Sequence, residues 1–441
     1  MLLRFAAENI LSFKDAVEFN TFPSSKSHSH DWHKVKCGHV TALRMSAVYG
    51  ANGAGKSNLL RCIYLLKQMM LEEKLGDVYF ADDLFFKFDA ESRMKPSELA
   101  IEFFVNESIY YYHIVFTRTQ IEQEELYLCE KKDDIPLFVR KGNEISLSPS
   151  EISEEDNKTF SDVLTRIVRP DMLLLAFFGK YYPQEFPPIA EAYRWLIDLQ
   201  VVLPDMKMGY ISHYMDSDAE FKDYINSVFP KFQTGIYRLD VKKEVVDIED
   251  AKGDPGLSRA IEAARENPGE PVMFQKNMYS YLSNIVCEND TIFLKSIVTV
   301  HRTRDGKDIE MQVMDESDGT RRLIEYLPLL YWILKESRIF IVDEIERSIH
   351  PIMIKTIMSR ISENTSAKGQ IIFTTHESCL LDQSIFRPDE IWFAQKDVEQ
   401  ATQLYPLSDY NVHKTANIEN GYLHGRYGAI PFLSNLSDLN W

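Results

Sequence analysis

A glycine-rich stretch between a short apolar run and a helix-like sequence carries the clearest chemistry in the chain. Gly50, Gly53, Gly55, Lys56 and Ser57 match the pattern G-x-x-x-x-G-K-[ST] without a mismatch. Glycines allow backbone N–H groups to close around phosphate oxygens, and the start of the helix adds positive potential. The lysine reaches the terminal phosphates and the serine hydroxyl coordinates Mg2+. The pattern therefore predicts a nucleoside triphosphate site, lined by Gly50, Asn52, Gly53, Ala54, Gly55, Lys56, Ser57 and Asn58.

Two adjacent carboxylates follow a second apolar run, IFIV, far along the chain. Asp343 is predicted to share the Mg2+ ion with Ser57, and Glu344 to orient the attacking water. A lone Asp-Glu pair after a buried strand is structural about as often as it is functional. Its combination with an intact phosphate loop favours the functional interpretation.

Two further groups fit the same site, although each has an ordinary alternative. Ser317 and Gly319 lie at the predicted start of a helix, where backbone donors bind anions, but S-D-G-T is also a common N-cap sequence. His376 ends a predicted buried strand, where it could bond a γ-phosphate, although an isolated histidine there is more often a structural one.

The hydrophobic pattern predicts an α/β fold. Strands are expected at 2–8 and 16–22, a helix at 56–72, and an antiparallel sub-sheet between 98 and 141. Alternating strands and helices after residue 290 predict a parallel sheet covered on both faces. We expect three parts: 1–147 with the phosphate loop, a mostly helical insertion at 148–271, and 272–441 with the remaining site residues.

The composition limits the partners and the compartment. The formal net charge of -18 is poorly suited to coating DNA through counterion release, so DNA is a weak candidate partner. The five cysteines are scattered and form no C-x-x-C pair, as is typical of reduced cytosolic thiols. No apolar stretch approaches the roughly 20 residues that span a bilayer. These features predict a soluble cytoplasmic protein without a membrane partner.

A histidine-rich stretch, HSHDWHKVKCGH, offers several nitrogen and sulfur ligands. The spacing of its ligands fits no standard zinc finger. We therefore expect a solvated loop before the phosphate-loop strand.

In this order the motifs resemble the ABC-type ATPase heads shared by structural-maintenance, recombination-repair and OLD proteins. GANGAGKS is similar to their Walker A motif, ESDGT to the signature, IFIVDE to Walker B and TTHE to the switch histidine. The resemblance implies a head with a mixed sheet, ATP and Mg2+ as cofactors, and Lys56, Glu344 and His376 as catalytic residues. It also implies a homodimer or higher assembly, in which Ser317 and Gly319 of one chain complete the site of the other in trans.

Two further positions matter for the comparison with the signature of these ATPase heads. The segment 347–351 is similar to the D-loop that follows Walker B, with Ser348 as its best polar candidate. Asp318 stands where transporter signatures usually have glycine. Since a carboxylate close to a γ-phosphate would be repelled, we expect either that Asp318 points away from the nucleotide or that the signature serves a slower, switch-like cycle.

NILSFKD, YGANGAGKSNLL, DEIERSIHP and YLHGRYGAIPFL resemble the stand-alone ATPases of bacterial anti-phage modules. These include RloA and AbiL-type proteins, with the PARIS ATPase AriA and the Septu ATPase PtuA as relatives. The resemblance implies an ATP-hydrolysing sensor or scaffold that controls a separately encoded toxin or nuclease, TOPRIM-like or HNH-like, with a phage protein as a possible trigger. OLD proteins continue into a TOPRIM nuclease, whereas this sequence ends at Trp441.

The alternative is a recombination-type ATPase that acts directly on DNA in repair. The acidic composition disfavours it, as does the lack of long heptad segments that would form a coiled-coil arm.

Overall fold

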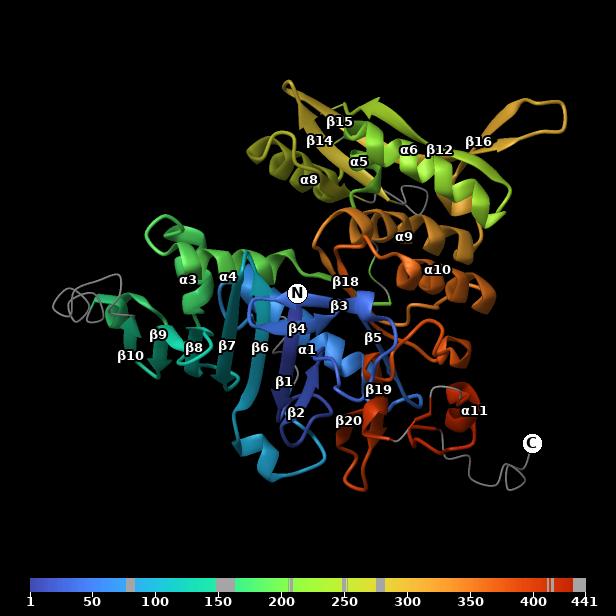
Figure 1. Ribbon diagram of the computed structural model, residues 1–441. Coiled ribbons are helices and arrows are strands. Elements are labelled where there is room, and N and C mark those ends of the chain that lie inside the picture. The colour runs from blue at the N-terminus through green and yellow to red at the C-terminus, as the bar shows by residue number, and fades with distance from the viewer. Residues whose placement is uncertain are drawn as a thin grey trace, which may run out of the picture. The chain divides into compact units, whose positions relative to one another are not determined.

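The computed structural model describes residues 1–76, 84–147, 163–204, 206, 209–247, 251, 253–274, 282–410, 412–413 and 416–430. The chain forms two compact units (Figure 1). Unit 1 comprises Met1–Leu203, Glu336–Ile345 and Met358–Trp441, and unit 2 comprises Pro204–Lys335 and Glu346–Ile357. Among the described residues, no helix combines the length and the apolar character needed to cross a membrane.

A six-stranded sheet in unit 1 positions most of the candidate site. In spatial order its strands are β11 (Gln200–Val202), β17 (Ile339–Val342), β18 (Gln370–Thr374), β5 (Met45–Tyr49), β19 (Ile391–Lys396) and β20 (Thr402–Pro406). All neighbouring pairs are parallel except β19 and β20. Every residue of β5, β17 and β18 is buried, which explains their continuous apolar sequences. The predicted parallel sheet is confirmed for β17 and β18, and the carboxyl ends of β5, β17 and β18 meet at one edge. The strand expected directly after residue 290 does not belong to it: it forms β15 (Thr291–Arg302), whose neighbouring strands in unit 2 are all antiparallel to it.

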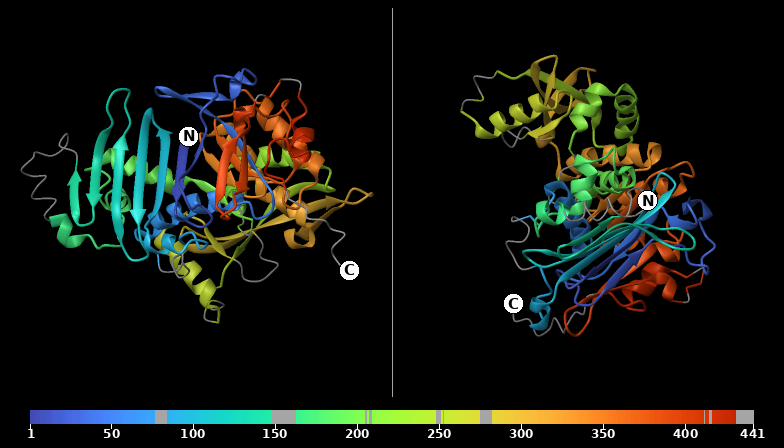
Figure 2. Two further views of the ribbon diagram at one scale, coloured as in Figure 1. Left: turned by 90° about the horizontal axis from the view of Figure 1, so that it is seen from below. Right: turned by 90° about the vertical axis from the view of Figure 1, so that its left-hand side faces the viewer.

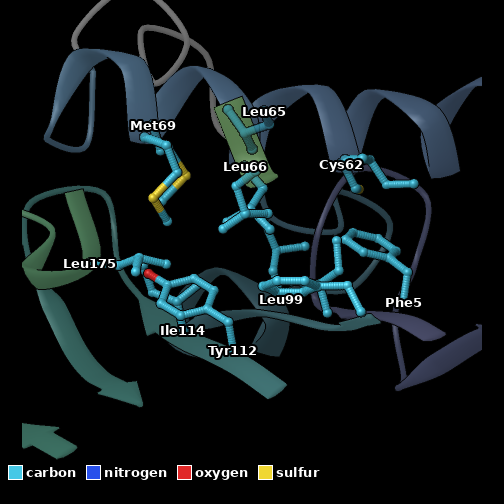
Figure 3. Packing of buried hydrophobic residues seen from close by; sticks show 14 of the residues in the cluster. Phe5, Cys62, Leu65, Leu66, Met69, Leu99, Tyr112, Ile114 and Leu175 are labelled. Carbon is cyan, nitrogen blue, oxygen red and sulfur yellow. The ribbon is translucent and has the colours of Figure 1, made fainter. Parts of the chain in front are cut away.

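Helix α1 (Lys56–Glu72) begins directly after the glycine-rich loop, as predicted. Its buried face carries Cys62, Leu65, Leu66 and Met69, among others. Figure 3 shows these side chains above residues of a second sheet and Leu175, within one continuous apolar cluster. This packing holds the first turn of α1, and with it Lys56 and Ser57, against the sheets.

The second sheet has seven strands, and every neighbouring pair is antiparallel (Figure 2). Its order is β10 (Glu144–Leu147), β9 (Ile135–Lys141), β8 (Ile121–Leu128), β7 (Ser108–Phe116), β6 (Ser97–Val105), β1 (Leu2–Glu8) and β2 (Val17–Asn20). The predicted antiparallel sub-sheet is confirmed, and β1 and β2 extend it.

Two helices of unit 1, α3 (Leu174–Tyr181) and α4 (Pro187–Asp198), bury apolar residues in the same cluster as α1. The buried carboxylate of Glu124 on β8 accepts hydrogen bonds from the backbone N–H groups of Leu174 (2.8 Å) and Leu175 (2.9 Å). Burial raises the pKa of Glu124. A carboxylate at this position satisfies two of the otherwise unpaired donors of the helix N-terminus.

Unit 2 is built around a sheet in the order β12 (Ile236–Val245), β15 (Thr291–Arg302), β14 (Ser283–Glu288) and β13 (Val272–Phe274), with β16 (Asp308–Gln312) also paired to β15. Its helices include α5 (Ile211–Ser217), α6 (Ala219–Val228), α8 (Pro255–Glu266) and α9 (Asp318–Lys335). The segment 148–271 therefore falls in both units: α3, α4 and β11 lie in unit 1, whereas α5, α6, β12 and α8 lie in unit 2. Helix α10 (Pro351–Glu363) follows Walker B, as predicted.

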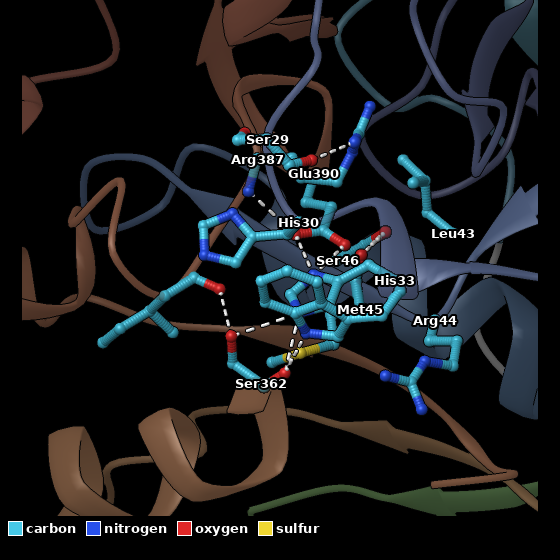
Figure 4. A network of polar contacts seen from close by, with 12 residues as sticks. Ser29, His30, His33, Leu43, Arg44, Met45, Ser46, Ser362, Arg387 and Glu390 are labelled. Atoms are coloured by element: carbon cyan, nitrogen blue, oxygen red, sulfur yellow. Dashed lines mark hydrogen bonds and ion pairs between the residues drawn. The ribbon is translucent and has the colours of Figure 1, made fainter. Parts of the chain in front are cut away.

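The histidine-rich stretch is only in part the solvated loop that we expected: His28 and His39 are exposed, but the segment between them includes strand β3 (Lys34–Cys37) and a buried histidine. His33 is fully buried, and its Nδ1 lies 2.8 Å from Glu390 Oε1 while its Nε2 lies 3.1 Å from Ser362 Oγ (Figure 4). The three side chains form a Ser–His–Glu arrangement. All three are buried, and the Ser362 hydroxyl donates to the carbonyl of Ile385 (2.7 Å), so no substrate reaches it. We interpret the arrangement as structural.

A buried ion pair lies beside this network. The guanidinium of Arg387 is fully buried and donates through Nε (2.9 Å) and Nη2 (2.7 Å) to the carboxylate of Asp389. Asp389→Ala is expected to lower the free energy of unfolding by roughly 3–5 kcal/mol, because it leaves a buried charge without its partner. Urea denaturation measures this change. The exposed Glu399→Ala is the control, and an equally small loss in both variants would contradict the prediction.

Candidate functional site

The glycine-rich loop bends around the amino group of Lys56. Lys56 Nζ donates hydrogen bonds to the carbonyl oxygens of Gly50 (2.8 Å) and Ala51 (3.1 Å). The lysine is 5% exposed, so its charge is held at the loop and not in solvent. A Cβ on Gly50 would lie 2.4 Å from the carbonyl oxygen of Ala394, which explains the glycine there. The loop therefore presents a nearly buried cation where the sequence predicts the terminal phosphates.

Ser57 and Asp343 meet across the edge of the six-stranded sheet. Ser57 Oγ donates to Asp343 Oδ1 at 3.0 Å, and the hydroxyl of Thr374 donates to the same oxygen. Asp343 is 1% exposed, and its Oδ2 has no hydrogen-bond partner among the residues that the structure describes. A buried unpaired carboxylate oxygen is costly unless a ligand satisfies it. Because Mg2+ binds one or two protein oxygens together with phosphate oxygens, Ser57 and Asp343 are a chemically suitable pair for it.

The described residues contain no group of three or more His, Cys, Asp or Glu side chains that could hold a metal ion by themselves.

Glu344 has a backbone conformation that side chains rarely adopt. Its φ is 50°, in the left-handed region, and its backbone N–H donates to Thr374 Oγ1 at 2.8 Å. Thr374 thus contacts both members of the Asp-Glu pair. Holding a residue in such a backbone conformation costs about 1–3 kcal/mol of folding free energy, and residues of this kind are concentrated at functional sites. The turn directs Asp343 and Glu344 differently although they are adjacent in sequence.

His376 lies beside the phosphate loop. Its Nδ1 is 3.5 Å from Lys56 Nζ. Burial lowers the pKa of His376, and the neighbouring charge of Lys56 lowers it further. The ring is therefore neutral at pH 7, with the ability to donate one hydrogen bond and accept another. Unit 1 brings together Lys56, Ser57, Asp343, Glu344 and His376 from three separate parts of the sequence.

Three supporting residues were missed by the sequence analysis: Ser12, Thr374 and Thr402. Thr402 is fully buried, and its hydroxyl donates to the carbonyl of Ala54 (2.9 Å) and lies 2.8 Å from Ser12 Oγ. Asn58 also donates to Ser12 Oγ, at 2.8 Å. A Cβ on Gly55 would lie 2.0 Å from Thr402 Oγ1. Ser12 and Thr374 stand within the quoted motifs NILSFKD and TTHE, but no motif marks Thr402.

Thr402→Val is expected to weaken nucleotide binding without removing any residue that faces the nucleotide. The substitution keeps the side-chain shape but removes two hydrogen-bond contacts behind the loop, worth roughly 1–3 kcal/mol together. Titration with a fluorescent ATP analogue measures the affinity. Thr402→Ser restores the hydroxyl and is the control. Equal affinity in Thr402→Val and the unmodified protein would contradict the prediction.

The predicted signature residues lie in unit 2 and form the start of α9. Ser317 Oγ accepts from the backbone N–H of Thr320 at 3.2 Å, which is an N-cap bond. The side chain of Asp318 is 74% exposed and pairs with Arg321. The carboxylate is thus turned to solvent and bound to its own helix. Gly319 packs closely against the segment after Walker B, since a Cβ there would lie 2.6 Å from the carbonyl oxygen of Ser348.

Three solved structures are among those that a structural comparison matches to this chain. The first, "Crystal structure of the SmcHead bound to the C-winged helix domain of ScpA", is 13% identical and has a TM-score of 0.44, with 92% of this chain and 97% of that chain covered. The SMC head domain from Thermotoga maritima is 12% identical, with a TM-score of 0.35 and coverages of 92% and 98%. An Smc head from Pyrococcus furiosus, bound to the C-terminal domain of ScpA, is 13% identical, with a TM-score of 0.36 and coverages of 92% and 96%.

No curated protein matches the sequence. A family model does: the one described as "AAA domain, putative AbiEii toxin, Type IV TA system" matches residues 45–382. The matched region includes the glycine-rich loop, the signature segment, the Asp-Glu pair and His376. It covers more than half of the chain. The chain therefore belongs to this AAA domain family.

Proposed function

We propose that the chain binds and hydrolyses ATP with Mg2+. The observation that carries the proposal is the convergence of Lys56, Ser57 and Asp343 at one sheet edge, with a buried unpaired oxygen on Asp343. Lys56 would exchange its bonds to the loop carbonyls for bonds to the β- and γ-phosphates. Ser57 and Asp343 would hold Mg2+, which neutralises charge on the transferring phosphoryl group.

Glu344 and His376 are proposed to act on the reacting end of the nucleotide. A carboxylate that follows the metal ligand by one residue is placed to orient a water molecule for in-line attack. The neutral ring of His376, 3.5 Å from Lys56, can donate a hydrogen bond to a γ-phosphate oxygen. Loss of that phosphate would remove the bond, so His376 would report the state of the nucleotide.

The site is proposed to be completed by a second copy of the chain. Ser317 and Gly319 at the start of α9 would supply backbone donors to the γ-phosphate bound by the partner's loop. Support comes from the exposure of Asp318, which leaves the first turn of α9 without a carboxylate directed at the anion.

Turnover should therefore depend on protein concentration. The rate of phosphate release per chain, measured over a range of protein concentrations with Mg2+ and ATP, is expected to rise until the dimer is populated. A rate per chain that stays constant down to nanomolar protein would overturn the dimer proposal. An absence of any ATP-dependent phosphate release would overturn the ATPase proposal itself.

For the biological role, we propose an ATP-dependent sensor or scaffold of an anti-phage defence module that controls a separately encoded toxin or nuclease. The toxin–antitoxin wording of the matched family and the similarity of four sequence segments to RloA and AbiL-type ATPases support this role. The test is a phage challenge of cells that carry the chain together with its neighbouring reading frames. Protection that is lost in Glu344→Gln but retained in Glu363→Gln would support the role. Equal protection with and without the chain would overturn it.

A further inference from the structure

The loop that precedes α9 is anchored to strand β15 by one carboxylate. Glu316 Oε1 accepts a hydrogen bond from Thr299 Oγ1 at 2.6 Å, and His301 Nε2 lies 2.8 Å from the same oxygen. Thr299 and His301 are two residues apart on β15, so they lie on the same face of the strand. The Glu316 side chain is only 9% exposed. Glu316 immediately precedes the proposed signature residue Ser317.

These contacts involve a residue whose burial has a cost. A carboxylate that is buried loses its hydration. Hydrogen bonds that it accepts from protein groups offset this loss only when their geometry is good. Glu316 has a hydroxyl and an imidazole within 2.8 Å of one oxygen. Thr299 is fully buried and cannot follow the carboxylate if the loop moves. The anchor therefore restricts where residue 317 can lie.

Other contacts fix the shape of the loop before α9, but they do not bind it to the sheet. Arg321 donates to the carbonyl oxygens of Met314 (3.1 Å) and Glu316 (3.3 Å), which closes the loop onto α9. Ser317 caps the helix through Thr320. These bonds keep the shape of the loop and the first turn of α9. Strand β16 joins the start of the loop to β15 as far as Gln312, and the Glu316 carboxylate joins the turn directly before Ser317 to the same strand.

We propose that Glu316 is a positioning residue, which holds Ser317 and Gly319 where they can cap the nucleotide of the partner chain. The inference rests on the proposed function in trans. It assigns to Glu316 a role that needs no contact with nucleotide: losing its carboxylate would displace the signature while leaving the chain's own phosphate loop intact. Displacements of about 1 Å at such a site lower rates by up to roughly 100-fold.

Glu316→Ala is expected to lower turnover by roughly 10- to 100-fold while its affinity for a fluorescent ATP analogue stays unchanged. Thr299→Val removes the buried hydroxyl that donates to Glu316 while it keeps the shape of the side chain. This variant is also expected to lower turnover. Glu310→Ala, an exposed carboxylate on the neighbouring strand β16, is the matched control and should keep full turnover. Circular dichroism melting identifies a variant that merely fails to fold, in which case Thr299→Val carries the test.

Mixing experiments separate positioning in trans from a general loss of structure. A mixture of Glu316→Ala with Glu344→Gln contains dimers in which one site has an intact loop, an intact Glu344 and an intact partner signature. This mixture is expected to regain turnover that neither variant has alone. Glu316→Ala mixed with Ser317→Arg should regain nothing, because both chains lack a working signature.

Each other outcome overturns a specific statement. If Ser317→Arg complements Glu344→Gln but Glu316→Ala does not, the role of Glu316 is wrong and the dimer proposal stands. If Glu344→Gln regains turnover neither with Ser317→Arg nor with Glu316→Ala, the arrangement in trans that the inference requires is wrong. Full turnover in Glu316→Ala, or a loss of nucleotide affinity equal to the loss of rate, would overturn the inference while leaving the ATPase proposal intact.

Discussion

Glu344→Gln is expected to lower ATP turnover by roughly 100-fold or more while nucleotide binding persists. The amide keeps the size of the side chain but loses the charge that orients and polarises water, and such losses raise a barrier by about 2.7–4 kcal/mol. Lys56, Ser57 and Asp343 are unchanged in this variant, and the bond from Glu344 to Thr374 is kept because its donor is the backbone N–H. ATP should therefore remain bound, and the dimer should accumulate.

Two measurements check this expectation. Single-turnover phosphate release gives the rate of the chemical step, and size-exclusion chromatography with ATP and Mg2+ reports the dimer. Glu363→Gln, an exposed carboxylate at the end of α10, is the matched control and should leave both unchanged. A loss of less than about tenfold in Glu344→Gln would mean that another group orients the water.

Local sequence pattern predicted the elements that carry the site. The helix predicted at 56–72 and the first strand predicted at 2–8 have the predicted bounds. The apolar runs at β5, β17 and β18 form the predicted parallel sheet. Strong periodicity and turn residues determine these elements locally, so no knowledge of their neighbours was needed.

The parts that the sequence did not predict depend on contacts between distant residues. Strand β19 is parallel to β5 across more than 300 residues, and it was not predicted. The burial of His33 follows from its bond to Glu390, which no local pattern reveals. Thr402 supports the phosphate loop through space and belongs to no motif. Side-chain chemistry was readable from motifs, whereas the residues that hold those side chains in place required the tertiary structure.

The division of the chain into two units also depends on contacts that a local sequence pattern does not reveal. A mostly helical segment was predicted at 148–271, but not that its helix α4 packs with α1 in unit 1. Periodicity identifies an apolar face without identifying its partner. The sequence therefore grouped α4 with the helices of unit 2, since they follow one another in the chain.

Lys56→Ala is expected to weaken ATP binding by at least roughly 100-fold and to raise the pKa of His376. The lysine is the nearly buried cation of the loop, and hydrogen bonds to a charged group contribute about 1.5–3 kcal/mol each, so two phosphate contacts exceed the roughly 2.7 kcal/mol that corresponds to 100-fold. Isothermal titration with ATP and Mg2+ measures the first effect. Lys56→Arg keeps the charge but not the compact shape, and it should retain part of the affinity.

The expected rise in the pKa of His376 distinguishes the loss of the Lys56 charge from a collapse of the loop. Burial and the charge of Lys56 both lower the pKa of His376, so removing the charge alone should move it part of the way back towards the ordinary value of about 6.5. The protonated fraction of the ring at pH 6 should therefore increase in Lys56→Ala but not in Lys56→Arg, as followed by NMR of the imidazole. If ATP binding is lost while the titration of His376 is the same in all three proteins, the 3.5 Å contact between the two side chains does not govern the ring. The ring would then owe its lowered pKa to burial alone, and the proposed role of His376 as a reporter would depend entirely on its hydrogen bond to the γ-phosphate.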